Sequence, residues 1–178
     1  YRRQRQMCIR DRYTGNGSTQ SITNAGSFPP DFVWAKERNG TNYHCLNDIV
    51  RGTQKVVFSN SSGAEEANGV SAFNSNGFSL DSWGGMNTNS NTYVAWQWKG
   101  NGAGVSNTSG TIASTVSANQ TSGFSVVTFT GTGTSGTIGH GLGAIPQFII
   151  LKKRNAASSS LGWVAWAFVG GVWQYGKL

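Results

Sequence analysis

Residues 92–98, Thr-Tyr-Val-Ala-Trp-Gln-Trp, contain the clearest strand signal in the sequence. Strict alternation would place one set of side chains on each face of an extended strand: Val94, Trp96 and Trp98 on one, Tyr93, Ala95 and Gln97 on the other. Aromatic and β-branched residues in this period-two pattern are typical of β-sheets. The segment therefore predicts a strand with two large, well-defined faces.

Similar patterns predict further strands along the chain, at residues 32–37, 55–58, 70–73, 77–80, 124–130, 147–152, 163–168 and 172–175. Asn76-Gly77 is a strong hairpin signal, and Gly63–Asn68 is the one place where the sequence favours a helical turn. Stretches of Gly, Asn and Ser separate the expected strands. We predict an all-β fold, an antiparallel two-sheet sandwich or jelly roll.

The composition excludes several other classes of protein. Gly, Ser, Thr and Asn supply 25, 21, 16 and 16 of the 178 residues, and all four are poor helix formers. A helix bundle or a coiled coil is therefore not expected. No apolar run has the length of a membrane span, so the sequence predicts no membrane partner. The 12% aromatic content argues against a disordered chain.

An internal repeat relates the two ends of the chain. Residues 13–39 align without a gap to residues 129–155, at an offset of 116, with nine identities in 27 positions. Identical pairs include Pro30 with Pro146 and Phe32 with Phe148. We predict one complete β module at residues 13–128, followed by a truncated second copy at residues 129–178.

Residues 1–12 differ in composition from the rest of the chain. They carry five Arg and one Asp, so they contribute +4 to the formal net charge of +7, and residues 2–12 resemble a sequencing-library adapter translated in one frame. We interpret this segment as an adapter artefact and expect it to be disordered. Without it the net charge is +3, and the cationic residues are too scattered to predict a nucleic-acid partner. Cys45 is then the only thiol.

Residues that could support catalysis or metal binding are sparse. His44 and His140 are the only histidines, no Gly-x-Ser-x-Gly elbow occurs, and Glu65 and Glu66 are adjacent rather than opposed. One Cys and two distant His do not match zinc spacing, and no calcium loop or P-loop is present. The sequence therefore predicts no catalytic residues, no metal and no cofactor.

The loop 81–91 offers the chemistry of recognition. A tryptophan lies there among short polar residues that could bind sugar hydroxyls while the indole stacks on the sugar ring. The candidate ligand-binding residues are Asp81, Trp83, Asn87, Asn89 and Asn91. In the alternative arrangement Trp83 folds back and caps the core.

Several segments together resemble an uncharacterised module of bacteriophage tail-fibre and related virion proteins, of a type frequent in marine phages. These segments are residues 13–17, 30–39, 76–80, 92–99 and 139–146. The resemblance implies a lectin-like sandwich of the concanavalin A class in a structural or adhesive protein, and it supplies no catalytic residues.

The resemblance gives three functional expectations. The first is a virion module that contributes to host-surface glycan recognition by multivalent display, in a homo-oligomer with other fibre subunits. The second is a passive structural spacer of the same fibre. The third is a fragment of a carbohydrate-active enzyme.

Overall fold

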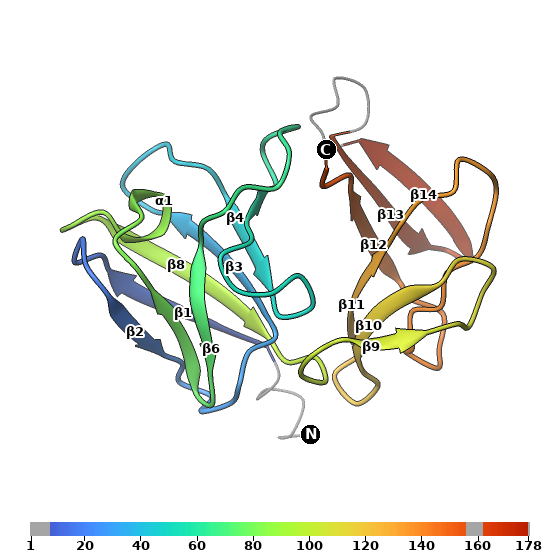
Figure 1. Ribbon diagram of the computed structural model, residues 1–178, viewed down its shortest axis with the longest axis horizontal. Helices are drawn as coiled ribbons and strands as arrows, with labels where there is room; N and C mark the ends of the chain where they lie inside the picture. The colour runs from blue at the N-terminus through green and yellow to red at the C-terminus, as the bar shows by residue number, and fades with distance from the viewer. Residues whose placement is uncertain (1–7, 156–161, 178) are drawn as a thin grey trace.

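The computed structural model describes residues 8–155 and 162–177, and nearly all of its regular structure is β (Figure 1). The strands are β1 (Cys8–Thr14), β2 (Gln20–Thr23), β3 (Phe32–Glu37), β4 (Cys45–Asp48), β5 (Val57–Phe58), β6 (Val70–Asn74), β7 (Gly77–Leu80), β8 (Thr92–Trp98), β9 (Val105–Asn107), β10 (Ser114–Asn119), β11 (Phe124–Phe129), β12 (Phe148–Lys152), β13 (Trp163–Val169) and β14 (Val172–Lys177). The four-residue helix α1 (Gly84–Asn87) follows β7. All named strand pairs are antiparallel, which confirms the predicted all-β class.

The first half of the chain forms two sheets with a shared core. One sheet has the order β1-β8-β3-β4-β5, and the other has the order β2-β7-β6. The core between them includes Val33 and Ala95 from the first sheet and Phe78 from the second, all of them at most 1% exposed. The expected sandwich-like packing of two antiparallel sheets is therefore present in this half.

Strand β8 has the two faces that its alternation predicts. Tyr93, Ala95 and Gln97 are fully buried between the sheets, while Trp96 and Trp98 lie partly buried on the opposite face. The strand pairs along its whole length with β1 on one side and, from Tyr93 to Trp98, with β3 on the other. Strand β8 thus connects β1 to the other strands of the five-stranded sheet.

The hairpin signal at Asn76-Gly77 is confirmed, with the turn one residue earlier than the dipeptide suggests. Asn74 pairs with Gly77 across the turn between β6 and β7. Gly77 has a φ of 155°, and a Cβ there would lie 1.9 Å from the carbonyl oxygen of Ile22. Close approach to β2 therefore requires glycine. The helical turn expected at Gly63–Asn68 is wrong, because helix α1 forms instead in the loop after β7.

The first strand overlaps the segment that we interpret as adapter-derived. Cys8 to Arg12 belong to β1 and pair in register with β8, from Cys8 opposite Trp98 to Arg12 opposite Val94. The expectation that all of residues 1–12 are disordered is therefore corrected for Cys8–Arg12, because backbone pairing to an edge of β8 depends little on side-chain identity. Residues 1–7 lie outside the described residues, and the adapter origin stays a prediction.

The second half of the chain contains two three-stranded sheets, β9-β10-β11 and β12-β13-β14, which lie beside the first half in Figure 1. The uncharged segment 101–120 supplies β9 and β10, and β10 is the central strand of its sheet. The predicted module boundary after residue 128 falls at the end of β11. The partly exposed strands of this half reflect a much smaller core than that of the first half.

The two halves meet through apolar side chains. Leu46, Val57 and Trp163 form a second buried cluster, against which Phe32, Trp34 and Ile150 pack. Phe124 also stacks on Trp98 at a centroid distance of 6.0 Å. The outer face of the five-stranded sheet is therefore covered by the second half of the chain.

Candidate functional site

The loop 81–91 is held in a defined conformation by its own polar groups. The carboxylate of Asp81 accepts a hydrogen bond from the backbone N–H of Trp83 at 2.9 Å and one from the Gln54 side chain at 3.3 Å. Helix α1 then begins directly after Trp83 and ends at Asn87. The carboxylate of Asp81 is thus engaged in hydrogen bonds within the protein rather than free for a ligand.

Trp83 packs onto the core. Its ring contacts the first core cluster, and its centroid lies 6.3 Å from that of Phe58. The ring also lies over Gly85, where a Cβ would come within 2.3 Å of the indole. The indole therefore sits as a partly buried cap over the core, which is the alternative arrangement that the sequence left open.

Asn87 is a buried structural hub. Its side-chain oxygen accepts hydrogen bonds from the Asn16 backbone at 2.9 Å and from the Gln20 side chain at 2.6 Å. Its amide nitrogen donates to the carbonyl oxygens of Ser18 and Asp81, each at 2.6 Å. Both side-chain atoms of this fully buried residue are thus engaged inside the protein, where they join the loop 15–18 to the loop 81–91.

Asn91 and Asn89 lie at the far end of the loop and differ in their surroundings. The Asn91 side chain donates to the carboxylate of Glu37 at 2.8 Å, and Glu37 is itself buried and also accepts a hydrogen bond from Asn42. Asn89 is exposed. The structure therefore brings Asp81, Trp83 and Asn87 together, and it leaves Asn89 as the predicted site residue most accessible to a ligand.

A groove that sequence reasoning did not identify lies in the second half of the chain. It has a volume of about 870 Å³ and runs between the sheet of β9 and β10 and the loop 138–146. Its lining is more apolar than polar: Val105, Val116, Ile138 and Ile145 lie in it beside the polar residues Asn101, Asn107, Gln120 and His140. The lining residues carry no Asp, Glu, Lys or Arg side chain, so the groove offers no charged group to a ligand.

Hydrogen bonds from the sheet fix the loop beside the groove. The Asn107 side chain donates to the carbonyl of Gly139 at 2.9 Å, and the Gln120 side chain donates to the carbonyl of Gly141 at 3.1 Å. Gly141 has a φ of 73°, and a Cβ there would lie 2.8 Å from the Ala118 side chain. The glycines around His140, which mark a loop in the sequence, therefore allow its close approach to the sheet.

A second groove adjoins the first. It has a volume of about 630 Å³ and shares Asn101, Ala118 and Gln120 with the first groove. Asp31 and Lys99 also line it. Burial raises the pKa of the Asp31 carboxyl above its usual value, and the backbone N–H groups of Gly102 and Gly100 and the Lys99 charge oppose this shift. Charge is thus present only at this end of the combined groove.

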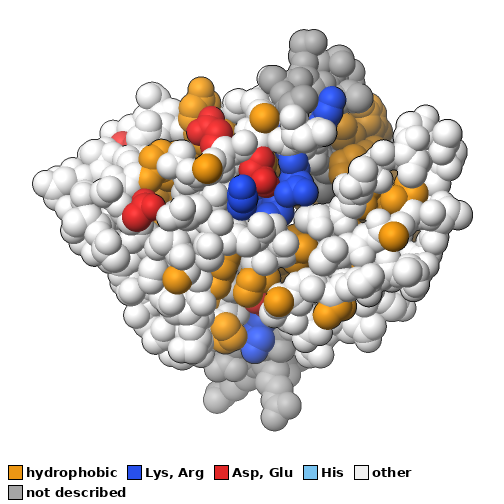
Figure 2. Space-filling model, viewed as in Figure 1, with side chains coloured by type: hydrophobic (Ala, Val, Ile, Leu, Met, Phe, Trp, Pro, Cys, Tyr) orange, Lys and Arg blue, Asp and Glu red, His pale blue; other side chains and the backbone are white. Residues whose placement is uncertain are grey.

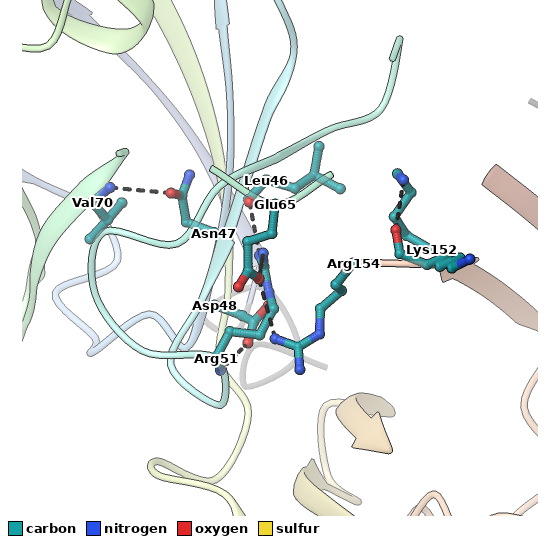
Figure 3. A network of polar contacts seen from close by, with 9 residues as sticks. Leu46, Asn47, Asp48, Arg51, Glu65, Val70, Lys152 and Arg154 are labelled. Carbon is teal, nitrogen blue, oxygen red and sulfur yellow. Dashed lines mark hydrogen bonds and ion pairs between the residues drawn. The ribbon is translucent and has the colours of Figure 1, made fainter. Parts of the chain in front are cut away.

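An ion-pair network joins the two halves of the chain (Figure 3). Arg51 pairs with Asp48 and Glu65, and Glu65 also pairs with Arg154 at 3.2 Å. The Arg51 and Asp48 side chains are each 5% exposed, and Arg51 also donates to the Leu46 carbonyl at 2.8 Å. The Arg51–Asp48 end of this network is therefore buried, whereas Arg154, which reaches it from the second half, is 42% exposed.

Charge is scarce on the visible surface. On the face in Figure 2 most of the surface is uncharged, and charged side chains gather near the middle, between the halves. Within residues 8–155 and 162–177 no three His, Cys, Asp or Glu residues lie close enough together to hold a metal ion. No helix in the same part of the chain is long and apolar enough to span a membrane.

Comparison with known proteins places this fold in a family. The chain belongs to the family described as domain of unknown function DUF7483. The family model matches residues 8–167, and it therefore includes β1 and crosses the expected boundary after residue 128. No curated protein and no solved structure matches the chain.

Proposed function

We propose that this chain is a non-enzymatic, tandemly repeated module of a bacteriophage tail-fibre-type virion protein. The observation that carries the proposal is the packing of the two repeat-related halves. Trp34 of β3 and Ile150 of β12 pack against the same buried cluster, and Ile150 occupies the repeat position of Trp34. Two repeated units that pack through equivalent apolar faces form a fixed pair rather than two beads on a flexible linker.

The non-enzymatic part of the proposal is supported by where the acidic side chains lie. Glu37, Asp48 and Glu65 are each bonded to amide or guanidinium groups within the protein. A glycosidase needs two carboxyl groups that face each other across a cleft, about 5–10 Å apart. Among the described residues, the larger groove has no carboxylate in its lining.

Host-surface glycan recognition is the second part of the proposal, and the larger groove favours it. Amide and hydroxyl groups such as those of Asn101 and Ser106 line it together with apolar side chains such as Ile138, which could contact the apolar face of a sugar ring. Without an aromatic platform in the lining, each site would bind weakly. Display of many copies on a homo-oligomeric fibre would raise the avidity by about 10²–10⁴. A concanavalin A-like jelly-roll topology belongs to this proposal as well.

A glycan array probed with two forms of the chain tests this function. The monomeric chain should give no durable signal, and the chain coupled to a multivalent bead should bind bacterial surface polysaccharides. Asn101→Ala should remove the bead signal, because the Asn101 side chain is exposed and lines both grooves. Asn89→Ala is the matched control at an exposed residue of the loop 81–91.

Three results would redirect the proposal. Loss of signal in Asn89→Ala with Asn101→Ala unchanged would move the binding site to the loop 81–91. Absence of bead binding to any polysaccharide would leave the passive spacer. New reducing ends in the polysaccharide after incubation would instead identify a fragment of a carbohydrate-active enzyme.

A further inference from the structure

The repeat relates strands of the second half to strands of the first. An offset of 116 residues carries β1 onto residues 124–130 and β3 onto residues 148–153. Strands β11 and β12 occupy these positions to within one residue at each end. The two halves therefore agree in secondary structure, as well as in sequence, over these strands.

The paired edges of these strands differ between the halves. In the first half β8 lies between β1 and β3 and pairs with both. In the second half β11 is paired with β10 and β12 is paired with β13, and both strands lie at the edge of their sheets within the described residues. Within the described residues, the edges of β11 and β12 that correspond to the β8-paired edges of β1 and β3 are therefore unpaired. Unpaired strand edges of this kind promote association with other strands.

One face of the β12-β13-β14 sheet is apolar. It is exposed on β12 and β14, whereas on the central strand β13 Val164 is buried and Trp166 and Phe168 are partly buried. The register places Ile149, Leu151, Trp166, Phe168, Trp173 and Tyr175 on the same face. Ile149 and Leu151 are each 38% exposed, and Tyr175 is 56% exposed. Monomeric proteins seldom leave a continuous apolar and aromatic face of this kind in water.

The first half shows what covers the corresponding face. Val33 and Ala35 occupy the repeat positions of Ile149 and Leu151, and both are buried beneath the β2-β7-β6 sheet. The opposite face of β12, with Ile150, already packs against the first half. The exposed face is thus the inner face of a sandwich that has one of its two layers.

We propose that the open edges of β11 and β12 and the apolar face of the β12-β13-β14 sheet form the receiving half of a second sandwich. Its occupant is a following segment of the same module in cis, equivalent to residues 63–98. The β8-type strand of that segment would insert between β11 and β12, and its β6-β7-type hairpin would cover Ile149 and Leu151. The inference rests on the tandem-module part of the proposed function and is independent of glycan binding.

An extended chain tests the inference. Leu178 corresponds to residue 62 at the offset of 116, so a copy of residues 63–98 is fused directly after Leu178. We expect fluorescence of the dye anilinonaphthalene sulfonate to fall several-fold relative to the 178-residue chain. Backbone amides of β11 and β12 should become protected from hydrogen exchange.

A matched control keeps the test specific. The same extension with Phe78→Asp and Ala95→Asp in the copied segment carries charge on the inner face, where both parent residues are fully buried. It should restore the dye signal and the fast exchange. The inference is overturned if the intact extension changes neither readout, or if the control protects β11 and β12 equally well.

Two further outcomes distinguish this inference from dimerisation and from the glycan part of the proposed function. A 178-residue chain that dimerises, and that keeps the dimer when extended, would show that a second copy covers the face and would overturn the inference. An extended chain that becomes protected but binds no glycan would support the inference and would contradict only the glycan part of the proposed function.

Discussion

The indole Nε1 of Trp163 donates a hydrogen bond of 2.6 Å to the backbone carbonyl of Phe58, across 105 residues of sequence. Trp163 is 5% exposed and lies in the apolar cluster between the two halves. We expect Trp163→Ala to lower the free energy of unfolding by about 3–5 kcal/mol, because it removes a large buried side chain. Trp163→Phe should lose about 1–3 kcal/mol, because the Phe58 carbonyl loses its donor.

Chemical denaturation followed by circular dichroism measures both effects. Trp173→Ala is the matched control, because Trp173 is 40% exposed on the face of β14 that points away from the first half and should change the stability by less than about 1 kcal/mol. Equal effects of Trp163→Ala and Trp173→Ala would show that Trp163 does not hold the halves together.

Asn87 provides a second prediction about stability. Asn87→Ala should destabilise the protein by about 2–4 kcal/mol, because it removes four hydrogen bonds to partly buried groups at once and leaves a void at a fully buried position. Asn89→Ala, two residues later and exposed, should leave the thermal midpoint nearly unchanged. A thermal midpoint for Asn87→Ala within a degree of the parent value would contradict the claim that the hydrogen bonds of Asn87 stabilise the fold.

These two asparagines show how far the sequence can predict the site. The alternation in β8 predicts which side chains point inward, because pleating fixes that direction. Loop amides carry no comparable periodicity, so Asn87 and Asn89 read alike as ligands for a sugar. Only the tertiary fold brings Ser18 and Asp81 to the Asn87 amide and leaves Asn89 in solvent.

The larger groove is hidden in the sequence for a related reason. Its lining comes from β9, β10 and the loop after β11, and residues 101–120 have neither an aromatic nor a charged residue to mark a site. Gly139 and Gly143 around His140 mark a loop, but they do not say which surface it approaches. The position of that loop depends on hydrogen bonds from Asn107 and Gln120.

The two cysteines should differ sharply in reactivity. Burial raises the pKa of the Cys45 thiol to about 12, and Cys45 is 1% exposed, whereas Cys8 is exposed on β1. At pH 8 the thiolate fraction of Cys45 would be on the order of 10⁻⁴. Titration with Ellman's reagent should therefore release one equivalent quickly from the folded chain and the second only in denaturant. Two fast equivalents in the folded chain would contradict the buried position of Cys45.

The pH dependence of stability should depend in part on Asp31. Because burial raises the pKa of this carboxyl, the folded protein holds its proton more tightly than the unfolded chain does. The stability that this proton contributes is fully present below the usual pKa of 3.8, and it is lost as the pH rises through the folded-state pKa.

Asp31→Asn removes this titration, and an amide oxygen at that position can still accept the hydrogen bond from the Gly102 N–H. The stability of Asp31→Asn relative to the parent chain should therefore increase from pH 3 to pH 7, as measured by urea unfolding at each pH. Asp81→Asn, in the loop after β7, serves as the control, and parallel curves for Asp31→Asn and the parent chain would show that the Asp31 charge is as well accommodated in the groove as in water.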